Sequence, residues 1–358
     1  MDSDPDRPRL RGTPLRSRET PEDFRVVEEP LYPPRGEGKH TFLFVEKRGR
    51  TTEQVARDLA RVSGGAARDV GIAGRKDRHA VTRQWFSLEG VDPERALDFE
   101  LEGARVLEAH RHDHKLRTGH LRANHFEVVL RGDAPVELAP VLVRASELES
   151  RGLPNRFGMQ RFGRDQDNAD RARALLSEGK PPRDRRAARF LVSALQSEVF
   201  NAVLDARSDS YDDVILGDVA RVEESGGLFW VDDLERERPR ARAFEISATG
   251  PIFGTKMRPP RGEAAELESE IMGRLGIPPQ ASLSFPRGLR ARGTRRPLRI
   301  RPEALSIETL ESGAAIRVVC ALPPGAYVTV LLEALVGEVV DGSRKASSPD
   351  APGDVGVS

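Results

Sequence analysis

Alternating apolar and polar positions predict several short strands in the first part of the chain. The clearest are Phe24–Glu28, Phe42–Glu46 and Asn124–Arg131. In the last of these, Phe126, Val128 and Leu130 share one side, which is the pattern of a half-buried strand. Two shorter extended segments, Val70–Ala73 and Gln84–Leu88, flank a glycine turn. The turn is therefore expected to lie on a rigid scaffold of strands.

A helix is predicted directly after the second strand. Thr51-Thr52-Glu53-Gln54 has the spacing of a capping box, in which the first and last side chains satisfy each other's free backbone N–H groups. Val55, Leu59 and Val62 then fall on one helical face. Gly64-Gly65 ends the helix, because glycine readily adopts the conformation that closes a helix C-terminus.

The second half of the chain has a different pattern of apolar positions, with longer predicted helices. Ala187–Arg207 repeats apolar residues every four positions, and Glu263–Gly276 does the same over a shorter length. Asp218–Asp232 and Ala314–Leu322 have strand character. Tyr327–Val340 follows a Pro-Pro-Gly turn and is apolar, so we expect a helix there.

The two ends of the chain contain few apolar residues. Residues 1–18 are rich in Asp, Arg and Pro, and residues 343–358 in Ser, Pro, Gly and Asp, so we expect both to be flexible. No signal-peptide core and no stretch of ~18 apolar residues is present. The sequence therefore predicts a cytoplasmic protein without membrane association. Its one cysteine, Cys320, lies on the apolar side of a strand pattern and is expected to be a core residue.

Positive charge is concentrated in one stretch although the chain as a whole is neutral. Lys plus Arg number 57 and Asp plus Glu also number 57, which weighs mildly against nucleic-acid binding. Arg287–Arg301, however, contains seven arginines and no acid. Such a run can dock phosphates through Arg290, Arg292, Arg295 and Arg296. The alternative is that these arginines solubilise the surface or neutralise acids such as those of Glu263–Glu270.

The segment most informative about chemistry is Ala73–Ser87, which contains the glycine turn followed by Lys76 and Asp77. Neighbouring positive charge favours an ionised carboxylate, and an ionised carboxylate on an exposed turn can act as a nucleophile. Taken alone, the Arg-Lys-Asp-Arg run is more typical of a solvated surface turn, since the chain is 32% charged.

Five further segments accompany this one in order and spacing, and together they resemble the TruD family of tRNA pseudouridine synthases. The resemblance extends from about Thr20 to about Asp341, nearly the whole chain. The six segments are Glu22-Asp23-Phe24, Gly74-Arg75-Lys76-Asp77, Asn124-His125-Phe126, Asn155–Gly163, Ser193–Asn201 and Gly250–Gly254.

The resemblance implies an α+β fold in which a catalytic domain is interrupted by an insertion. The catalytic domain of this family is a mixed, largely antiparallel sheet with helices, and on this sequence it would comprise 19–152 and 303–342. The inserted α/β TRUD domain would be 153–302. Periodicity alone does not indicate that the first and last parts form one domain.

The activity implied by the resemblance is isomerisation of a tRNA uridine to pseudouridine, at position 13 in the D-arm region for bacterial enzymes. The reaction needs no redox cofactor, metal or energy donor, and no obligate protein partner is evident. Asp77 matches the catalytic aspartate of the family. Whether it attacks the sugar, adds to the base or removes a sugar proton stays open at this stage. So do the full set of RNA targets and the oligomeric state.

Further residues would bind the substrate. Lys76 matches the family's lysine before the aspartate, and Lys115 is an alternative cation partner for Asp77. Phe24 would shape or stack on the uridine pocket, and Asn124 would contact the uracil edge or the ribose. Two other residues complete the set. Tyr327 stands where the family usually has Phe, and Arg161 is a candidate phosphate contact, whereas Gln160, Gln196 and Asn201 are expected to be mainly structural.

Two other functions are compatible with parts of the sequence. His110, His112 and His114 have spacing that could hold a metal, which would suit a metal-dependent hydrolase, but no Cys partner accompanies them and we expect no metal site. A non-catalytic RNA-binding protein is the other alternative. The presence of Asp77 argues against it, because loss of that carboxylate would be the simplest sign of lost catalysis.

Overall fold

The structure is a computed structural model that describes residues 14–345 except 164, 181–182, 280–281 and 311–312. Its contacts divide the chain into two compact units. Unit 1 is Met1–Ser146, Pro302–Val328 and Leu332–Ser358, and unit 2 is Glu147–Arg301 with Thr329–Leu331. The expected insertion at 153–302 stays a prediction. None of the described helices is long and apolar enough to cross a membrane.

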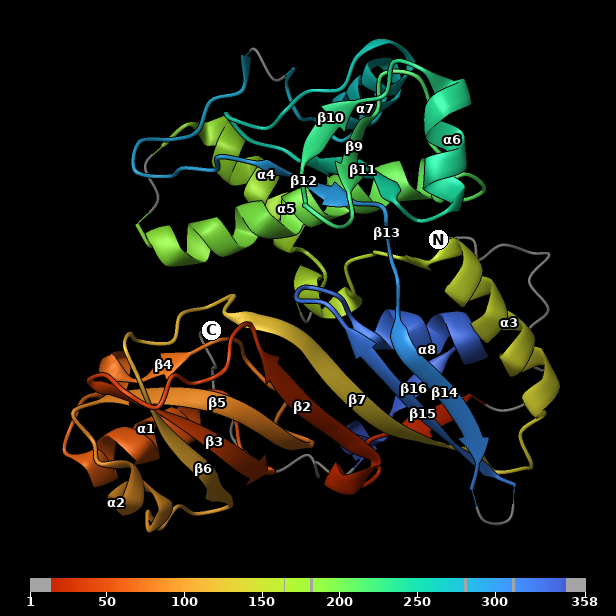
Figure 1. Cartoon of the computed structure of the whole chain (residues 1–358). Coiled ribbons are helices and arrows are strands. Elements are labelled where there is room, and N and C mark those ends of the chain that lie inside the picture. The colour runs from red at the N-terminus through yellow and green to blue at the C-terminus, as the bar shows by residue number, and fades with distance from the viewer. Residues whose placement is uncertain (1–13, 164, 181–182, 280–281, 311–312, 346–358) are drawn as a thin grey trace. The chain divides into compact units, whose positions relative to one another are not determined.

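Unit 1 is built on one sheet whose main path runs β14-β15-β7-β2-β5-β3-β6 (Figure 1). Three short strands pair at its margins. Only β2–β5 and β1–β16 pair in parallel among the described strands, so the expectation of a mixed, largely antiparallel sheet is confirmed. The ten strands are β1 Leu15–Ser17, β2 Phe24–Pro30, β3 His40–Arg48, β4 Gly71–Ile72, β5 Val81–Glu89, β6 Ala104–His112, β7 Leu121–Arg131, β14 Glu303–Thr309, β15 Ala315–Leu322 and β16 Val339–Asp341.

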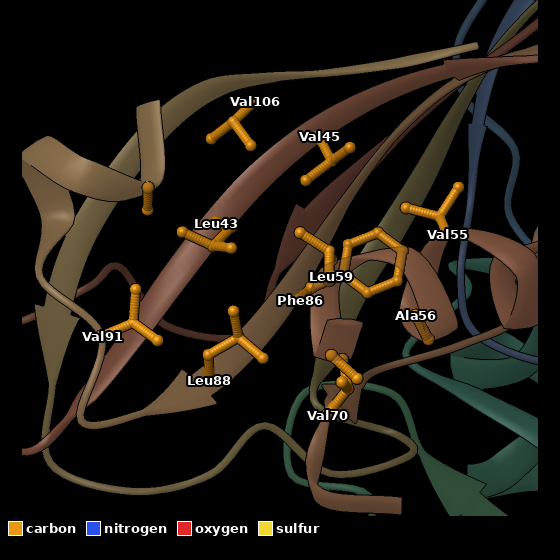
Figure 2. Close-up of a cluster of buried hydrophobic side chains, with 12 residues drawn as sticks. Leu43, Val45, Val55, Ala56, Leu59, Val70, Phe86, Leu88, Val91 and Val106 are labelled. Carbon is orange, nitrogen blue, oxygen red and sulfur yellow. The ribbon is translucent and has the colours of Figure 1, made fainter. Parts of the chain in front are cut away.

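Helix α1 (Thr52–Ser63) begins and ends as its sequence predicts. The Thr51 hydroxyl accepts from the Gln54 N–H at 3.1 Å, and the Gln54 side chain accepts from the Thr51 N–H at 2.8 Å. Gly64 closes the helix with φ of 78°. The apolar face of α1 packs against β3, β5 and β6 in a cluster that includes Leu59 and Phe86 (Figure 2). Burial of each such side chain contributes about 2 kcal/mol, which fixes the helix against the sheet.

The other described helical segments of unit 1 are α2 Pro93–Leu97 and the 3-10 turns Pro21–Asp23, Ala67–Asp69 and Gly342–Lys345. Two helices, α3 Leu138–Arg151 and α8 Val328–Val336, have residues in both units. Cys320 lies on β15 and is buried, as expected. Burial raises the pKa of its thiol to about 12, because the thiolate would lose its hydration.

The two ends differ from expectation where they join the sheet. Leu15–Ser17 is a strand rather than part of a flexible lead-in, and it pairs in parallel with Val339–Asp341. The helix expected over Tyr327–Val340 ends at Val336, because Gly337 leaves helical geometry with φ of 84°. Gly342–Lys345 forms a 3-10 turn where the tail was expected to be flexible. These pairings join segments at opposite ends of the sequence, so no local pattern indicates them. Residues 1–13 and 346–358 lie outside the described residues.

Unit 2 combines helices with a four-stranded antiparallel sheet of order β10-β9-β11-β12. The strands are β9 Val219–Val222, β10 Leu228–Trp230, β11 Ile246–Ile252 and β12 Thr294–Pro297, with a separate pair of β8 Leu153–Pro154 and β13 Arg299–Ile300. The helices are α4 Asn168–Glu178, α5 Arg185–Ala206, α6 Leu234–Arg242 and α7 Gly262–Arg274, with a 3-10 turn at Met159–Phe162. The predicted long helix, the strand character around Gly226 and the second helix are confirmed as α5, the β9–β10 hairpin and α7.

Candidate active site

The segment carrying Asp77 connects β4 to β5 and is tied down by buried polar side chains. The Lys76 backbone N–H donates to the Thr52 hydroxyl at 2.9 Å, and that hydroxyl donates to the Gln84 side-chain oxygen at 2.8 Å. The Gln84 amide in turn donates to the Gly74 carbonyl at 3.2 Å. Thr52 and Gln84 are fully buried. The first turn of α1 and a central strand therefore fix the backbone of the loop on which the carboxylate sits.

Lys76 turns into the protein and does not pair with Asp77. Its ammonium contacts the Glu28 carboxylate, and the two side chains are 6% and 0% exposed. The other Glu28 oxygen accepts from the Trp85 backbone N–H at 3.1 Å. Burial raises the pKa of Glu28, and the charge of Lys76 acts against that rise. Lys76 and Glu28 thus form an internal ion pair beneath the loop. Lys115 also does not serve as a partner of Asp77, since it donates to the Arg68 carbonyl at 2.9 Å.

The cation beside Asp77 is Arg18, a residue that the sequence analysis placed in a flexible segment. Arg18 Nη2 donates to Asp77 Oδ2 at 3.0 Å, and the Asp77 side chain is 50% exposed. Arg18 also lies 3.7 Å from the Asp341 carboxylate and covers the Phe24 ring at 3.9 Å. The carboxylate is therefore accessible, with one oxygen held by a guanidinium that is itself held in place.

Lys47 supports the loop from below. Its ammonium donates to the backbone carbonyls of Asp77 and Arg50, each at 2.7 Å. The side chain is buried, and burial lowers its pKa to about 8, while the charge of Asp77 acts in the opposite direction. A proton on Lys47 therefore adds positive charge next to Asp77 at neutral pH.

Phe24 and Asn124 come from the adjacent strands β2 and β7. The Phe24 ring is buried and meets Phe126 edge-on, with ring centroids 6.2 Å apart. In the sheet register Asn124 stands opposite Glu28 on one side and Leu322 on the other. Its Oδ1 atom is buried and accepts no hydrogen bond among the described residues. Tyr327 immediately precedes α8, and its contact with a uridine stays a prediction.

The motif residues Asn201 and Gln196, which lie in unit 2, make structural hydrogen bonds. The Asn201 amide bonds both the N–H and the carbonyl of Phe157, at 2.9 and 3.0 Å, and Gln196 donates to the Phe253 carbonyl at 2.6 Å. Arg161 lies in the Met159–Phe162 turn of unit 2, half-buried and 3.4 Å from the Ser197 hydroxyl. Its role as a phosphate contact stays a prediction.

The arginine run divides into buried and exposed members. Arg295 is buried and pairs with Glu268, and Arg299 is buried and donates to the Arg151 carbonyl at 2.9 Å. Arg296 donates to the Asn155 carbonyl and lies over the Phe157 ring. For Arg295 the alternative is confirmed, because its buried side chain neutralises an acid of Glu263–Glu270. Arg296 is half-buried and bonded within unit 2, and its contact with RNA stays a prediction. Arg290 and Arg292 are exposed.

The histidines separate into different environments. His110 is exposed and pairs with Glu108 at 3.2 Å. His112 is buried, stacks on Tyr32 at 5.2 Å and meets the His114 ring at 4.5 Å. Burial lowers the pKa of His112, and the neighbouring His114 lowers it further. Within the described ranges, no three or more His, Cys, Asp or Glu side chains are arranged to hold a metal ion.

The chain is similar to known proteins over most of its length. The family model of TruD, tRNA pseudouridine synthase D, matches residues 9–183 and 170–335. This chain belongs to the TruD family. The tRNA pseudouridine synthase D of an Anaeromyxobacter species (strain Fw109-5) is 43% identical, over 89% of this chain and 91% of the relative. That of a Thermus thermophilus strain is 40% identical, over 92% and 91%.

The fold is also that of the TruD family. A crystal structure from Methanosarcina mazei, assigned as tRNA pseudouridine synthase D, superposes with a TM-score of 0.72. It covers 94% of this chain and 96% of the other chain at 20% identity. The predicted α+β class is therefore confirmed.

Three residues that support Asp77 were not found from the sequence. Glu28 and Lys47 left a signal, because each is a charged residue at a buried position of an alternating strand. A charge at such a position is expected to have a buried partner. Arg18 left no such signal, because it follows an Arg-rich segment in which the sequence does not distinguish one arginine from another.

Proposed function

We propose that this TruD-family protein isomerises a uridine of tRNA to pseudouridine, at position 13 in the D-arm region, with Asp77 as the catalytic carboxylate. Membership of the family supports the coarser statement, that the chain is an isomerase of the tRNA pseudouridine synthase class. The observation that supports Asp77 is its geometry: an exposed carboxylate on a loop held by buried hydrogen bonds and paired with Arg18. The same proposal places the protein in the cytoplasm with its tRNA substrate.

The reaction breaks the bond between ribose C1′ and uracil N1, rotates the base and forms a bond from C1′ to C5. C5 then loses its proton and N1 gains one, so no atom is gained or lost overall. Arg18 binds Oδ2 of Asp77, and Oδ1 has no hydrogen-bond partner in the described part of the chain. Oδ1 is thus the oxygen available to the sugar, the base or a proton. Each of these roles needs an ionised carboxylate, and the side chains of Arg18 and Lys47 bring positive charge next to this one.

The uridine pocket in this proposal is lined by β2 and β7. Asn124 Oδ1 is a buried acceptor to which no described residue donates, and the N3–H of uracil is a donor that would satisfy it. Phe24 is buried beneath Arg18, so we assign it to the wall of the pocket rather than to stacking on the base. Tyr327 and Lys115 remain substrate contacts by resemblance alone.

The direct test uses tRNA transcript labelled with tritium at uracil C5. The protein should release the label without added cofactor and in the presence of a chelator, because C5 becomes the glycosidic carbon. Asp77→Asn should abolish release while leaving the unfolding temperature near that of the wild type, since the exposed side chain contributes little to stability. Release by the Asn variant at the wild-type rate would mean that another carboxylate is catalytic. Absence of release from any tRNA pool would contradict the enzymatic function itself.

The position of the modified uridine in tRNA is tested in a separate experiment. Unmodified total RNA is treated with the protein, and pseudouridines are mapped by carbodiimide-dependent stops of reverse transcription. We expect stops at position 13 of tRNA. Stops confined to other positions would retain the activity and overturn the assignment of the site.

A further inference from the structure

Unit 2 contains a pocket of about 310 Å³ between α5 and the loop that leads into β12. The rim is formed by Arg189, Arg290 and Arg292, and the lining includes no carboxylate. Pockets that bind small ligands begin at roughly 300 Å³. The size suits one nucleotide rather than a bare ion or a large cofactor.

The three rim arginines have no counter-charge among the described residues. Each is exposed, and none forms an ion pair or a side-chain hydrogen bond with another described residue. Nine other arginines of unit 2 form ion pairs with described carboxylates, as Arg295 does with Glu268. Arg185 and Arg186 add charge at the first turn of α5, where the helix dipole disfavours cations. The positive charges of such a cluster repel one another, which lowers the stability of unit 2, and a bound anion would reduce this repulsion.

The floor of the pocket is apolar and rigid. Val192 and Leu289 line it and are almost fully buried. Gly293, with φ of 76°, lies so close to Gly254 that a Cβ on it would come within 2.6 Å of the Gly254 nitrogen. Gln196, also in the lining, is fixed by its bond to the Phe253 carbonyl. The loop therefore presents Arg290 and Arg292 from a fixed backbone.

We propose that this pocket binds one nucleotide of an RNA, with its phosphate on Arg189, Arg290 and Arg292 and its sugar or base over the apolar floor. Guanidinium groups bind phosphate oxygens in a bidentate manner, and phosphate contacts supply most of the affinity for nucleic acid. The proposal rests on the proposed function, because it takes tRNA as the RNA. It assigns unit 2 a defined contact with the RNA backbone, away from the residues that hold the unit together.

The test compares two double variants for tRNA binding. At roughly 0.15 M salt, Arg290→Gln/Arg292→Gln should weaken binding by about fivefold and should reduce the slope of log affinity against log salt by about 0.9, because the one phosphate in the pocket loses two of its three arginines. Arg242→Gln/Arg274→Gln is the matched control, since both residues are exposed, lie in unit 2 and are outside the pocket. The control should retain the wild-type affinity to within twofold and most of the salt slope. Equal effects of the two double variants would overturn the proposal that the pocket binds RNA, and would mean that positive charge spread over unit 2 accounts for the affinity.

A second variant separates the cavity from its charge. Ala291→Phe fills the pocket without changing any charge. We expect it to lower tRNA affinity while the unfolding temperature stays close to that of the wild type. Wild-type affinity in a folded Ala291→Phe protein would show that no nucleotide enters the pocket.

Two further experiments test whether the bound phosphate belongs to RNA or is a free anion, and whether the proposed function holds. Phenylglyoxal modification, mapped by mass spectrometry, should be slowed at the three arginines by tRNA and not by millimolar inorganic phosphate; protection by inorganic phosphate alone would make this an anion site unrelated to RNA. Tritium release at subsaturating tRNA should fall in Arg290→Gln/Arg292→Gln in proportion to the loss of affinity, and release at the wild-type rate would contradict the pocket's part in binding the substrate. If the wild type binds tRNA with the expected pocket dependence but releases no tritium, the proposed function fails and the pocket stands.

Discussion

Replacing Arg295 by Gln should destabilise unit 2 and leave RNA binding intact. The guanidinium is fully buried and donates to Glu268 at 2.8 Å and to the Thr249 hydroxyl at 2.9 Å. Glu268 is itself buried, so removal of its partner leaves a carboxylate in the interior without its hydrogen-bonded counter-charge. Breaking a buried pair from one side costs about 3–5 kcal/mol. For a unit of this size, that corresponds to a fall of roughly 10 °C in unfolding temperature.

The loss should depend on pH. Burial raises the pKa of Glu268 even with Arg295 beside it, and without Arg295 it rises further. A carboxyl whose folded pKa lies above its unfolded value of about 4.3 destabilises the fold progressively as pH rises between the two values. Arg295→Gln should therefore be nearest to the wild type at about pH 4 and fall behind toward pH 7.

Scanning calorimetry across this pH range measures both effects. Arg295→Gln/Glu268→Gln is the control, because it removes the buried charge and should recover part of the loss. Affinity for tRNA and its salt dependence are measured alongside and should match those of the wild type below the unfolding temperature. An Arg295→Gln protein with wild-type unfolding and a shallower salt slope would refute this reasoning and restore Arg295 as an RNA contact.

Three further predictions concern unit 1. Glu28→Gln leaves the buried Lys76 ammonium without its counter-charge and should lower the free energy of unfolding by about 3 kcal/mol in denaturant titration. The control is Glu46→Gln, which removes a more exposed pair with Arg83 and should cost less than about 1 kcal/mol. Equal losses in the two variants would contradict the internal pair of Glu28 and Lys76. The pKa of Lys47 is lowered to about 8, so the single-turnover rate should fall as pH rises through that value. This fall should be absent from the pH profile of Lys47→Met, and a fall that persists in the variant would belong to another group. Cys320, with its pKa raised to about 12, should resist a disulfide-exchange reagent at pH 8 in the native protein and react after denaturation, and fast native labelling would mean that β15 opens.

The sequence by itself determined the elements that rest on neighbouring residues. The capping box and Gly64 define the ends of α1, and the four-residue apolar repeat defines α5, because helices are stabilised by contacts within a few positions. The motif around Asp77 and its companions was sufficient to indicate the family. What these patterns encode is local or shared with relatives, so each could be recognised without a structure.

The tertiary structure alone decided which charges meet. Arg18 and Asp77 are 59 positions apart, Lys76 and Glu28 are 48 apart, and Arg295 and Glu268 are 27 apart. No periodicity links such pairs, since each forms only when segments that are far apart in the sequence are packed together. The same physical reason explains the errors of the sequence analysis. Leu15–Ser17 becomes ordered because Val339–Asp341 lies beside it, and Arg295 turns inward because the fold brings a carboxylate to meet it.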